Sequence, residues 1–264
     1  MEKSMLVSNS KWNILALVLL GGLFFYLAGF EGYWDIIAKS NQFLIFFAAV
    51  FLVCLVTCLN TNGIFFLWLL VFGFFVGLIS QIMGTFNNLW IYTGKNESYI
   101  FTGFLWAFSA AAMHGLSLAL MRLFPEMKSN RYNVLCLIIL FLVIPVFLGR
   151  FRTAANLNFW IYYVCVFVFS AVATARLKFS ALLSLVLAAW VVGYITETIG
   201  SNIGLWTYCA VPDGAETARS IACWSPPPYL TFGCWPLIFI AQMGLSFFLS
   251  QEHLNMRSDS ESGT

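Results

Sequence analysis

The sequence predicts an all-α polytopic membrane protein with about eight transmembrane helices, arranged as two parallel four-helix repeats. Three observations lead to this prediction. Of the 264 residues, 61% are hydrophobic and only 9% are charged, which lies far outside the range of soluble domains. The apolar residues come in runs of about 20, the length of a helix that crosses a bilayer. Finally, a motif in the third apolar run returns in the seventh.

Polar or Gly- and Pro-containing turns divide the apolar runs into eight expected helices. They lie near residues 12–30, 42–60, 63–84, 100–122, 133–150, 158–176, 179–200 and 229–250. The first is expected to be a retained span, because no small-residue cleavage site follows it. The Ser-rich, charged tail at residues 251–264 is expected to be disordered and cytoplasmic.

The repeated motif places one polar residue between glycines on a single helical face. Its spacing of four, three and four residues brings all members of a copy to that face. The two copies read Gly77, Gln81, Gly84 and Asn88, and then Gly193, Glu197, Gly200 and Gly204. Each copy is followed by a Trp-x-Tyr triplet, formed by Trp90 and Tyr92 in the first copy and by Trp206 and Tyr208 in the second.

The similarity continues outside this motif. Thr102 and Trp106 match Thr231 and Trp235, and the expected first and fifth helices open on similar triplets. Ordered matches at separate places predict a doubled four-helix unit, with one copy at residues 1–126 and the other at 127–250. An even number of helices per copy gives both copies one orientation, so their axis should lie along the membrane normal.

The distribution of Lys and Arg residues predicts how the protein is oriented in its membrane. Most of the 13 Lys and Arg residues fall on the side of both expected termini, which indicates cytoplasmic termini and external Trp-x-Tyr segments. We expect a cell membrane, in particular a bacterial inner membrane. The net charge of +2 and the lack of a basic cluster indicate no nucleic-acid partner. The expected partners are membrane lipid and a lipophilic small molecule, and glycine faces such as that of Gly73 and Gly77 allow an oligomer.

An insertion after Tyr208 carries two cysteines on the expected external side. A disulfide between Cys209 and Cys223 and a pair of free thiols both fit this placement. Cys234 follows at the start of the last helix and could pair with either of them.

Glu197 is the acidic residue that falls inside an expected span, and such a residue is a functional candidate because burying a charge in a membrane is costly. As a carboxylic acid it could donate a proton to a substrate. The alternative is a hydrated structural role at the helix end. Gln81 cannot exchange a proton, so the asymmetry favours one active centre, although a helix-to-helix hydrogen bond also explains this residue. His114 could shuttle a proton or act as a structural donor.

The substrate-binding candidates lie near these residues in the repeat pattern. They are Trp90, Tyr92, Asn88, Trp206, Tyr208 and Gln242. Aromatic faces beside an acid suit the binding of a hydrophobic or cationic species. The alternative explanation of these aromatic residues is a belt at the membrane interface. With only two His residues and no phosphate loop or dinucleotide fingerprint, we expect no metal and no cofactor.

The line from Glu197 through Gly200 to Trp206 and Tyr208 resembles the acidic helix-end motifs of membrane carotenoid enzymes, namely the small helical lycopene cyclases and the related hydratases. Uncharacterised bacterial multi-pass membrane families carry similar sequence motifs. The resemblance implies an intramembrane carboxylic acid that protonates a polyene double bond without a metal. The chain departs from the cyclases in lacking a Pro-x-Glu-Glu type motif, in having Gln81 where the other half has an acid, and in having four helices per half rather than three.

The resulting hypothesis is a metal-independent membrane enzyme that acts on an isoprenoid or another lipophilic substrate by acid catalysis from Glu197. Two alternatives stay open. One is a transporter or flippase of lipids or small molecules that uses Glu197 as its coupling site. The other is a non-catalytic factor that assembles with a larger membrane complex.

Overall fold

The computed structural model describes residues 2–30, 32–87, 89–92, 100–124, 130–150, 157–175, 177–208 and 229–261. All eight expected helices are present. The long helices are α1 (Glu2–Phe30), α3 (Asn41–Asn60), α4 (Gly63–Phe86), α5 (Ile100–Met121), α6 (Asn130–Arg150), α7 (Leu157–Thr174), α8 (Phe179–Asn202) and α9 (Trp235–Glu261). Four short elements join them, namely α2 (Trp34–Lys39), the π-helix η2 (Tyr229–Cys234) and the strands β1 (Trp90–Tyr92) and β2 (Trp206–Tyr208).

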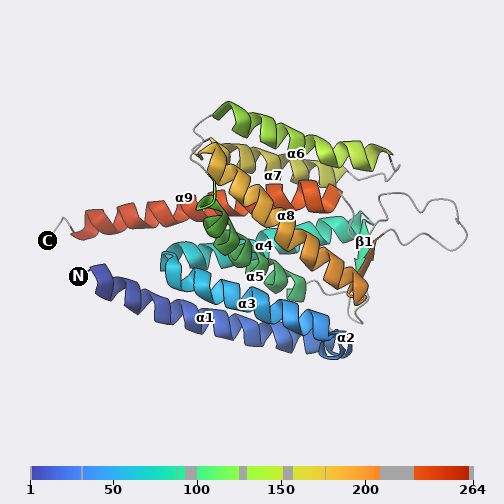
Figure 1. Ribbon diagram of the computed structural model, residues 1–264, viewed down its shortest axis with the longest axis horizontal. Coiled ribbons are helices and arrows are strands. Elements are labelled where there is room, and N and C mark those ends of the chain that lie inside the picture. The colour runs from blue at the N-terminus through green and yellow to red at the C-terminus, as the bar shows by residue number, and fades with distance from the viewer. Residues whose placement is uncertain are drawn as a thin grey trace, which may run out of the picture.

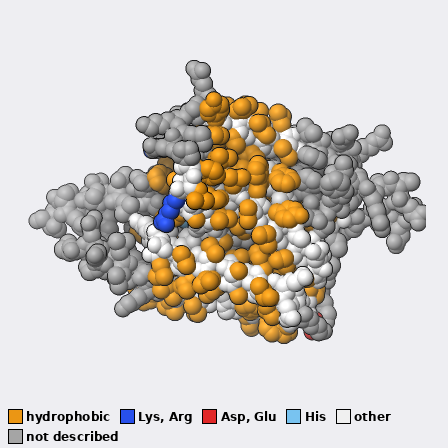
Figure 2. All heavy atoms as spheres, in the orientation of Figure 1, with side chains coloured by type: hydrophobic (Ala, Val, Ile, Leu, Met, Phe, Trp, Pro, Cys, Tyr) orange, Lys and Arg blue, Asp and Glu red, His pale blue; other side chains and the backbone are white. Residues whose placement is uncertain are grey.

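The surface is that of a membrane protein. In the described part of the chain, seven helices are long and apolar enough to cross a bilayer, and α6 adds a shorter apolar stretch at Tyr132–Val143. Hydrophobic side chains cover the face seen in Figure 2, and the few charged ones in view lie towards its two ends. Such a surface is stable against acyl chains but not against water. The predicted all-α polytopic membrane fold is therefore confirmed.

The helices run roughly side by side, with both termini at one end of the molecule and with α2 and the strands at the other (Figure 1). Four helices form the centre, where α5 packs against α4 and α8, and α9 packs against α4 and α8 as well. On the outside, α3 covers α5 and α7 covers α9. The central helices thus come from both halves of the chain.

Two side-chain caps explain where helices of the first half begin. Ser40 Oγ accepts a hydrogen bond from the Phe43 N–H at 3.2 Å and so caps α3. Asn62 Oδ1 accepts one from the Ile64 N–H at 2.9 Å and caps α4. Each cap satisfies a backbone donor that the first helical turn leaves unpaired.

Glycines let the central helices approach closely. A Cβ added at Gly73 would lie 2.8 Å from Ala107 Cα, and one at Gly77 would overlap the Trp106 side chain. On α8, a Cβ at Gly193 would lie 2.7 Å from Trp235 Cγ. These glycine faces are thus taken up by contacts within the chain, and an oligomer built on them stays a prediction.

The two strands join the halves at the end opposite the termini. They pair antiparallel around Ile91 and Thr207, so that Trp90 lies opposite Tyr208 and Tyr92 opposite Trp206. The sequence analysis predicts no strands here, since three residues are too few to show strand periodicity. The structure pairs each strand with one more than 100 residues away.

The backbone turns in the same way between helix and strand in both halves. The Leu89 N–H donates to the Gly84 carbonyl at 2.9 Å, and the Leu205 N–H donates to the Gly200 carbonyl at 2.8 Å. In the second half the turn passes through Gly204, whose φ of 77° favours glycine.

Some expectations differ from the structure or fall outside it. The tail was expected to be disordered from Gln251, but α9 continues as a helix to Glu261, because the residues just after the span are good helix formers. Likewise, α1 begins at Glu2 rather than near residue 12. Asn88, Cys209 and Cys223 lie outside the described residues, while Cys234 is a free, buried thiol.

Gly77→Ala is expected to destabilise the protein by about 1–3 kcal/mol, because the added methyl group overlaps Trp106 in a packed interior. Gly22→Ala is the matched control, since a Cβ there meets nothing within 4 Å. Thermal unfolding in detergent, followed by tryptophan fluorescence, measures both variants. Equal melting temperatures for the two variants would contradict the packing described here.

Candidate functional site

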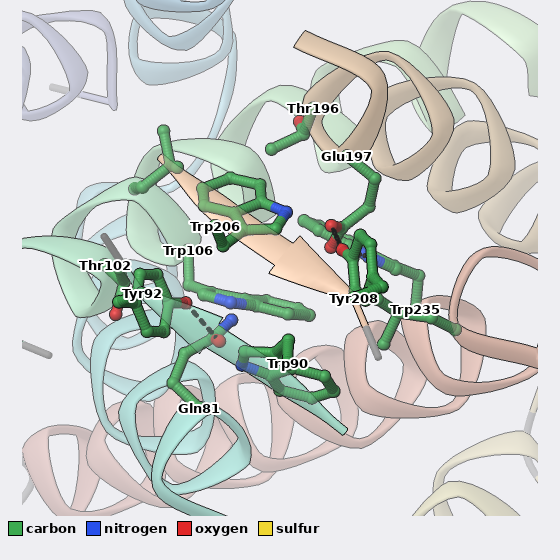
Figure 3. Close-up of a pocket in the computed structure, with 12 residues that line it drawn as sticks. Gln81, Trp90, Tyr92, Thr102, Trp106, Thr196, Glu197, Trp206, Tyr208 and Trp235 are labelled. Carbon is green, nitrogen blue, oxygen red and sulfur yellow. Dashed lines mark hydrogen bonds between the residues drawn. The ribbon is translucent and has the colours of Figure 1, made fainter. Parts of the chain in front are cut away.

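A small cavity lies beneath the strand pair, between the central helices (Figure 3). Side chains from both halves enclose it. They are Gln81, Trp90, Tyr92, Thr102, Leu105 and Trp106 from the first half, and Thr196, Glu197, Trp206, Tyr208, Leu230 and Trp235 from the second. The space for the centres of water-sized molecules is about 10 Å³, which is roughly the room that one water molecule needs.

Glu197 supplies the carboxyl group of the site. It lies near the end of α8 and is only 4% exposed. Its Oε1 accepts a hydrogen bond from Trp235 Nε1 at 2.8 Å, and its Oε2 accepts one from the Tyr208 hydroxyl. Among the described residues no Lys or Arg lines the cavity. The carboxyl is therefore held by neutral donors rather than by an ion pair.

Gln81 occupies the corresponding place on α4. It is buried, and its Oε1 accepts a hydrogen bond from the Tyr92 hydroxyl, as Glu197 accepts one from Tyr208. In both cases the tyrosine follows its partner by 11 residues. The two halves thus share one hydrogen-bond geometry, but only the second half carries a group that can exchange a proton.

Two stacked indoles lie at the centre of the site. The rings of Trp106 and Trp235 stack with centroids 3.9 Å apart and planes inclined by 15°. Trp106 packs on Gly77 of α4, and Trp235 packs on Gly193 of α8. Figure 3 shows the Trp106 ring between the side chains that carry the amide and the carboxyl.

The side chains of Trp90, Tyr92, Trp206 and Tyr208 form an aromatic roof, a layer of rings that covers the cavity on the side of the strands. Trp90 meets Tyr208 edge to face with centroids 6.4 Å apart, and Tyr92 meets Trp206 in the same way at 5.9 Å. The Trp90 ring covers Gly84, and the Trp206 ring covers Gly200 in the same way. A side chain at either glycine would push the roof off the helix end.

Six of the predicted site residues meet at this cavity. Glu197 and Gln81 face it together with the four residues of the Trp-x-Tyr triplets. His114 and Gln242 do not line it. The His114 ring packs against the Phe65 ring with centroids 5.1 Å apart, and Gln242 is fully buried on α9. Among the described residues, His114 therefore does not share the cavity with Glu197.

The sequence analysis missed half of the lining, most importantly Trp106 and Trp235. Both tryptophans stand among the repeated positions, and this recurrence is the sequence signal that marks them. Thr102, which is also a repeated position, was missed too, as were Thr196, Leu105 and Leu230. The last three reach the cavity through the crossing of helices, which a single sequence does not reveal.

Comparisons with protein-family models, with curated proteins and with solved structures found no match to this chain. The similarity to carotenoid enzymes therefore stays an expectation carried by four residues, namely Glu197, Gly200, Trp206 and Tyr208.

Glu197→Leu is expected to destabilise the protein by about 1–3 kcal/mol more than Glu197→Gln does. Leucine leaves the Tyr208 hydroxyl and the Trp235 N–H without an acceptor in a buried place, whereas glutamine keeps an acceptor oxygen. Chemical or thermal unfolding of both variants in detergent compares them. Equal stabilities would show that these two hydrogen bonds do not hold the carboxyl.

Proposed function

We propose that this integral membrane protein is an enzyme in which the Glu197 carboxyl protonates an isoprenoid or another lipophilic substrate that contains a double bond. The observation that carries the proposal is the setting of Glu197, a buried acid without a cationic partner in the described cavity, surrounded by aromatic rings. Burying an ionisable side chain in a membrane span costs free energy, so its presence there points to a function.

The hydrogen bonds of Glu197 suit a proton donor. Once the proton has left, the carboxylate is stabilised by the donors already in place, the Tyr208 hydroxyl and the Trp235 N–H. Because these groups need not move, they stabilise the charge that develops during proton transfer.

The aromatic walls suit the cation that forms on the substrate. Protonation of a double bond leaves a carbocation, and the rings of Trp106, Trp206 and Trp235 line the cavity together with the carboxyl (Figure 3). Indole faces attract cations through their quadrupole, most strongly where water is excluded. Gln81 adds a polar but proton-inert group, so one half of the site supplies the proton and the other completes the wall.

A lipophilic substrate requires the cavity to open, because about 10 Å³ admits only a water-sized molecule. The wall built by η2 is the proposed entrance. Leu230 lines the cavity, while Phe232 is 43% exposed on the outer surface, so this wall is one helix thick. Trp190 Nε1 of α8 donates a hydrogen bond to the Phe232 carbonyl of η2 at 3.2 Å and so links these two helices at the proposed entrance. Short π-helices are often found at functional sites.

We also propose that the two halves descend from one four-helix unit. Three matched sets of contacts support this. Gly77 and Gly193 each receive a tryptophan, Gly84 and Gly200 each receive another, and the polar residues of α4 and α8 each accept from a tyrosine. The halves would be related by an axis along the membrane normal.

The distribution of basic residues supports the proposed orientation in the membrane. Arg122 and Lys178 are exposed at the ends of α5 and α8 that lie on the side of the termini. Together with the other basic residues expected on this side, they support cytoplasmic termini, and we propose a bacterial inner membrane as the location.

The small cavity favours a second candidate, a transporter that uses Glu197 as its coupling site. A space of this size has room for a proton or a water molecule without any rearrangement. Proton-coupled uptake into liposomes that contain the purified protein would support this candidate over the enzyme. An assembly factor would show neither uptake nor a product.

Glu197→Gln is expected to abolish product formation while the protein still accumulates in the membrane, because glutamine keeps the acceptor oxygen but has no proton to give. Lipid extracts of cells that express wild type, the variant or no protein would be compared by mass spectrometry. Asp35→Asn is the matched control, since it makes the same chemical change at an exposed position on α2 and should leave the product unchanged.

Two outcomes would contradict the enzymatic proposal. One is a wild-type lipid profile that does not differ from that of cells without the protein. The other is an undiminished product in Glu197→Gln.

A further inference from the structure

One hydrogen bond and one ring contact join α8 to η2. Trp190 Nε1 of α8 donates to the Phe232 carbonyl of η2 at 3.2 Å. The rings of the same two residues meet edge to face, with centroids 5.7 Å apart and planes inclined by 83°. We refer to this pair of interactions as the α8–η2 contact.

Pro236 explains why the Phe232 carbonyl is open to a side-chain donor. In an α-helix this carbonyl would accept from the backbone N–H four residues later, but proline has no N–H and its ring clashes with that carbonyl. Accordingly, the segment Tyr229–Cys234 is a π-helix, and α9 begins as an α-helix only at Trp235. The Trp190 indole thus replaces a backbone hydrogen bond that Pro236 cannot make.

The first half is built differently at the same place. Three positions correspond in the repeat, namely Gly103 and Phe232, Phe74 and Trp190, and Ala107 and Pro236. A Cβ at Gly103 would lie 2.8 Å from the Phe74 ring, so α4 and α5 are in direct apolar contact there. With alanine in place of proline, α5 is a continuous α-helix over Ile100–Met121. Only the half that carries the acid has an interrupted helix joined to its neighbour by a side-chain hydrogen bond.

The α8–η2 contact separates the cavity from the membrane. On its inner side Leu230 lines the cavity. On its outer side Phe232 is 43% exposed, and Trp190 is half-buried. The two contacting residues lie within the apolar spans Phe179–Asn202 and Leu230–Ser250. The outer side of the contact therefore faces acyl chains.

We propose that the α8–η2 contact is a lateral gate to the membrane and that the Trp190 N–H holds it closed. When the indole releases the Phe232 carbonyl, η2 can move away from α8, because Pro236 provides no helical hydrogen bond to that carbonyl. Leu230 then leaves the cavity wall, and a lipophilic molecule reaches Glu197 directly from the acyl chains. The gate rests on the entrance named in the proposed function, but its opening requires no turnover.

The aromatic roof is less suited to opening. Its strands are paired through all three of their residues, and the rings of Trp90 and Trp206 pack on Gly84 and Gly200. Lifting the roof would break contacts in both halves at once. Opening the gate breaks a single hydrogen bond and one edge-to-face ring contact.

Carbodiimide labelling of Glu197 tests the gate without any catalysis. A protonated carboxyl gives its proton to a carbodiimide nitrogen while its oxygen adds to the central carbon, and the adduct rearranges to a stable N-acylurea that keeps every atom of the reagent. Dicyclohexylcarbodiimide enters the bilayer, whereas a cationic, water-soluble carbodiimide does not. The purified full chain in proteoliposomes would be treated with each reagent, and peptide mass spectrometry would follow the labelled fraction of Glu197 over time.

We expect the lipophilic reagent to label Glu197 and the water-soluble reagent to label it far more slowly. Trp190→Phe keeps an aromatic ring but removes the N–H, and it should speed labelling by the lipophilic reagent about 2- to 10-fold, the factor that one hydrogen bond supplies. Trp68→Phe is the matched control. This half-buried tryptophan of α4 stacks on Phe72 with centroids 5.6 Å apart, and its replacement should leave the rate unchanged.

The gate is overturned if the lipophilic reagent leaves Glu197 unlabelled, if the water-soluble reagent labels it equally fast, or if Trp190→Phe reacts no faster than Trp68→Phe. Should Trp190→Phe fail to fold, Trp190 can be replaced by benzothienylalanine, which keeps the shape of the ring system but lacks the N–H, with the same expected acceleration. The gate and the proposed function fail separately. Gated labelling without a lipid product supports the gate and contradicts the enzyme, whereas a Glu197-dependent product without gated labelling overturns the gate alone.

Discussion

The stack of Trp106 on Trp235 is the contact on which the rest of the structure depends. Two indoles with centroids 3.9 Å apart can lie between helices of opposite halves only if the facing helices carry no side chain at the contact. Gly77 and Gly193 meet that requirement. The stack then sets how closely α5 and α9 approach α4 and α8, and it places aromatic faces at the centre of a membrane-embedded site.

The strand pair completes the site at the end of the molecule opposite the termini. Each strand begins directly after a helix whose last glycine accepts a tryptophan ring, so the roof is held to α4 and α8 by packing as well as by backbone hydrogen bonds. Within this common frame the halves differ by one functional group, since Gln81 and Glu197 both accept from a tyrosine but only Glu197 can transfer a proton. The two halves thus share one hydrogen-bond arrangement and differ in whether its polar group can exchange a proton.

Much of this arrangement could be predicted from the sequence. Apolar runs of bilayer length predict the membrane-spanning part of each helix, because a chain that crosses the bilayer must satisfy its backbone groups within a helix. The extensions of α1 and α9 lie outside these runs. The recurrence of Gly, a polar residue and a Trp-x-Tyr triplet predicts that Gln81 and Glu197 lie in equivalent places, and both line the cavity.

The rest depends on contacts between distant parts of the chain. The strand pairing of Ile91 with Thr207 leaves no periodic signal in three residues. The roles of Trp106 and Trp235 require knowledge of which helices cross, and an apolar pattern does not encode that. His114, for which a proton shuttle and a structural role both fit the sequence, packs against Phe65 and does not line the cavity. Finally, the aromatic rings fill most of the space between the halves, so the cavity is far smaller than the chamber that a lipophilic substrate suggests.

A double-mutant cycle on the stack tests the central claim most directly. The free energies of unfolding of wild type, Trp106→Leu, Trp235→Leu and the double variant would be measured in the same detergent. Direct ring contact between the halves predicts non-additivity, with a coupling energy of about 0.5–1.5 kcal/mol. If the two single losses add up to the loss in the double variant, the indoles do not touch, and the shared site between the halves does not exist as described.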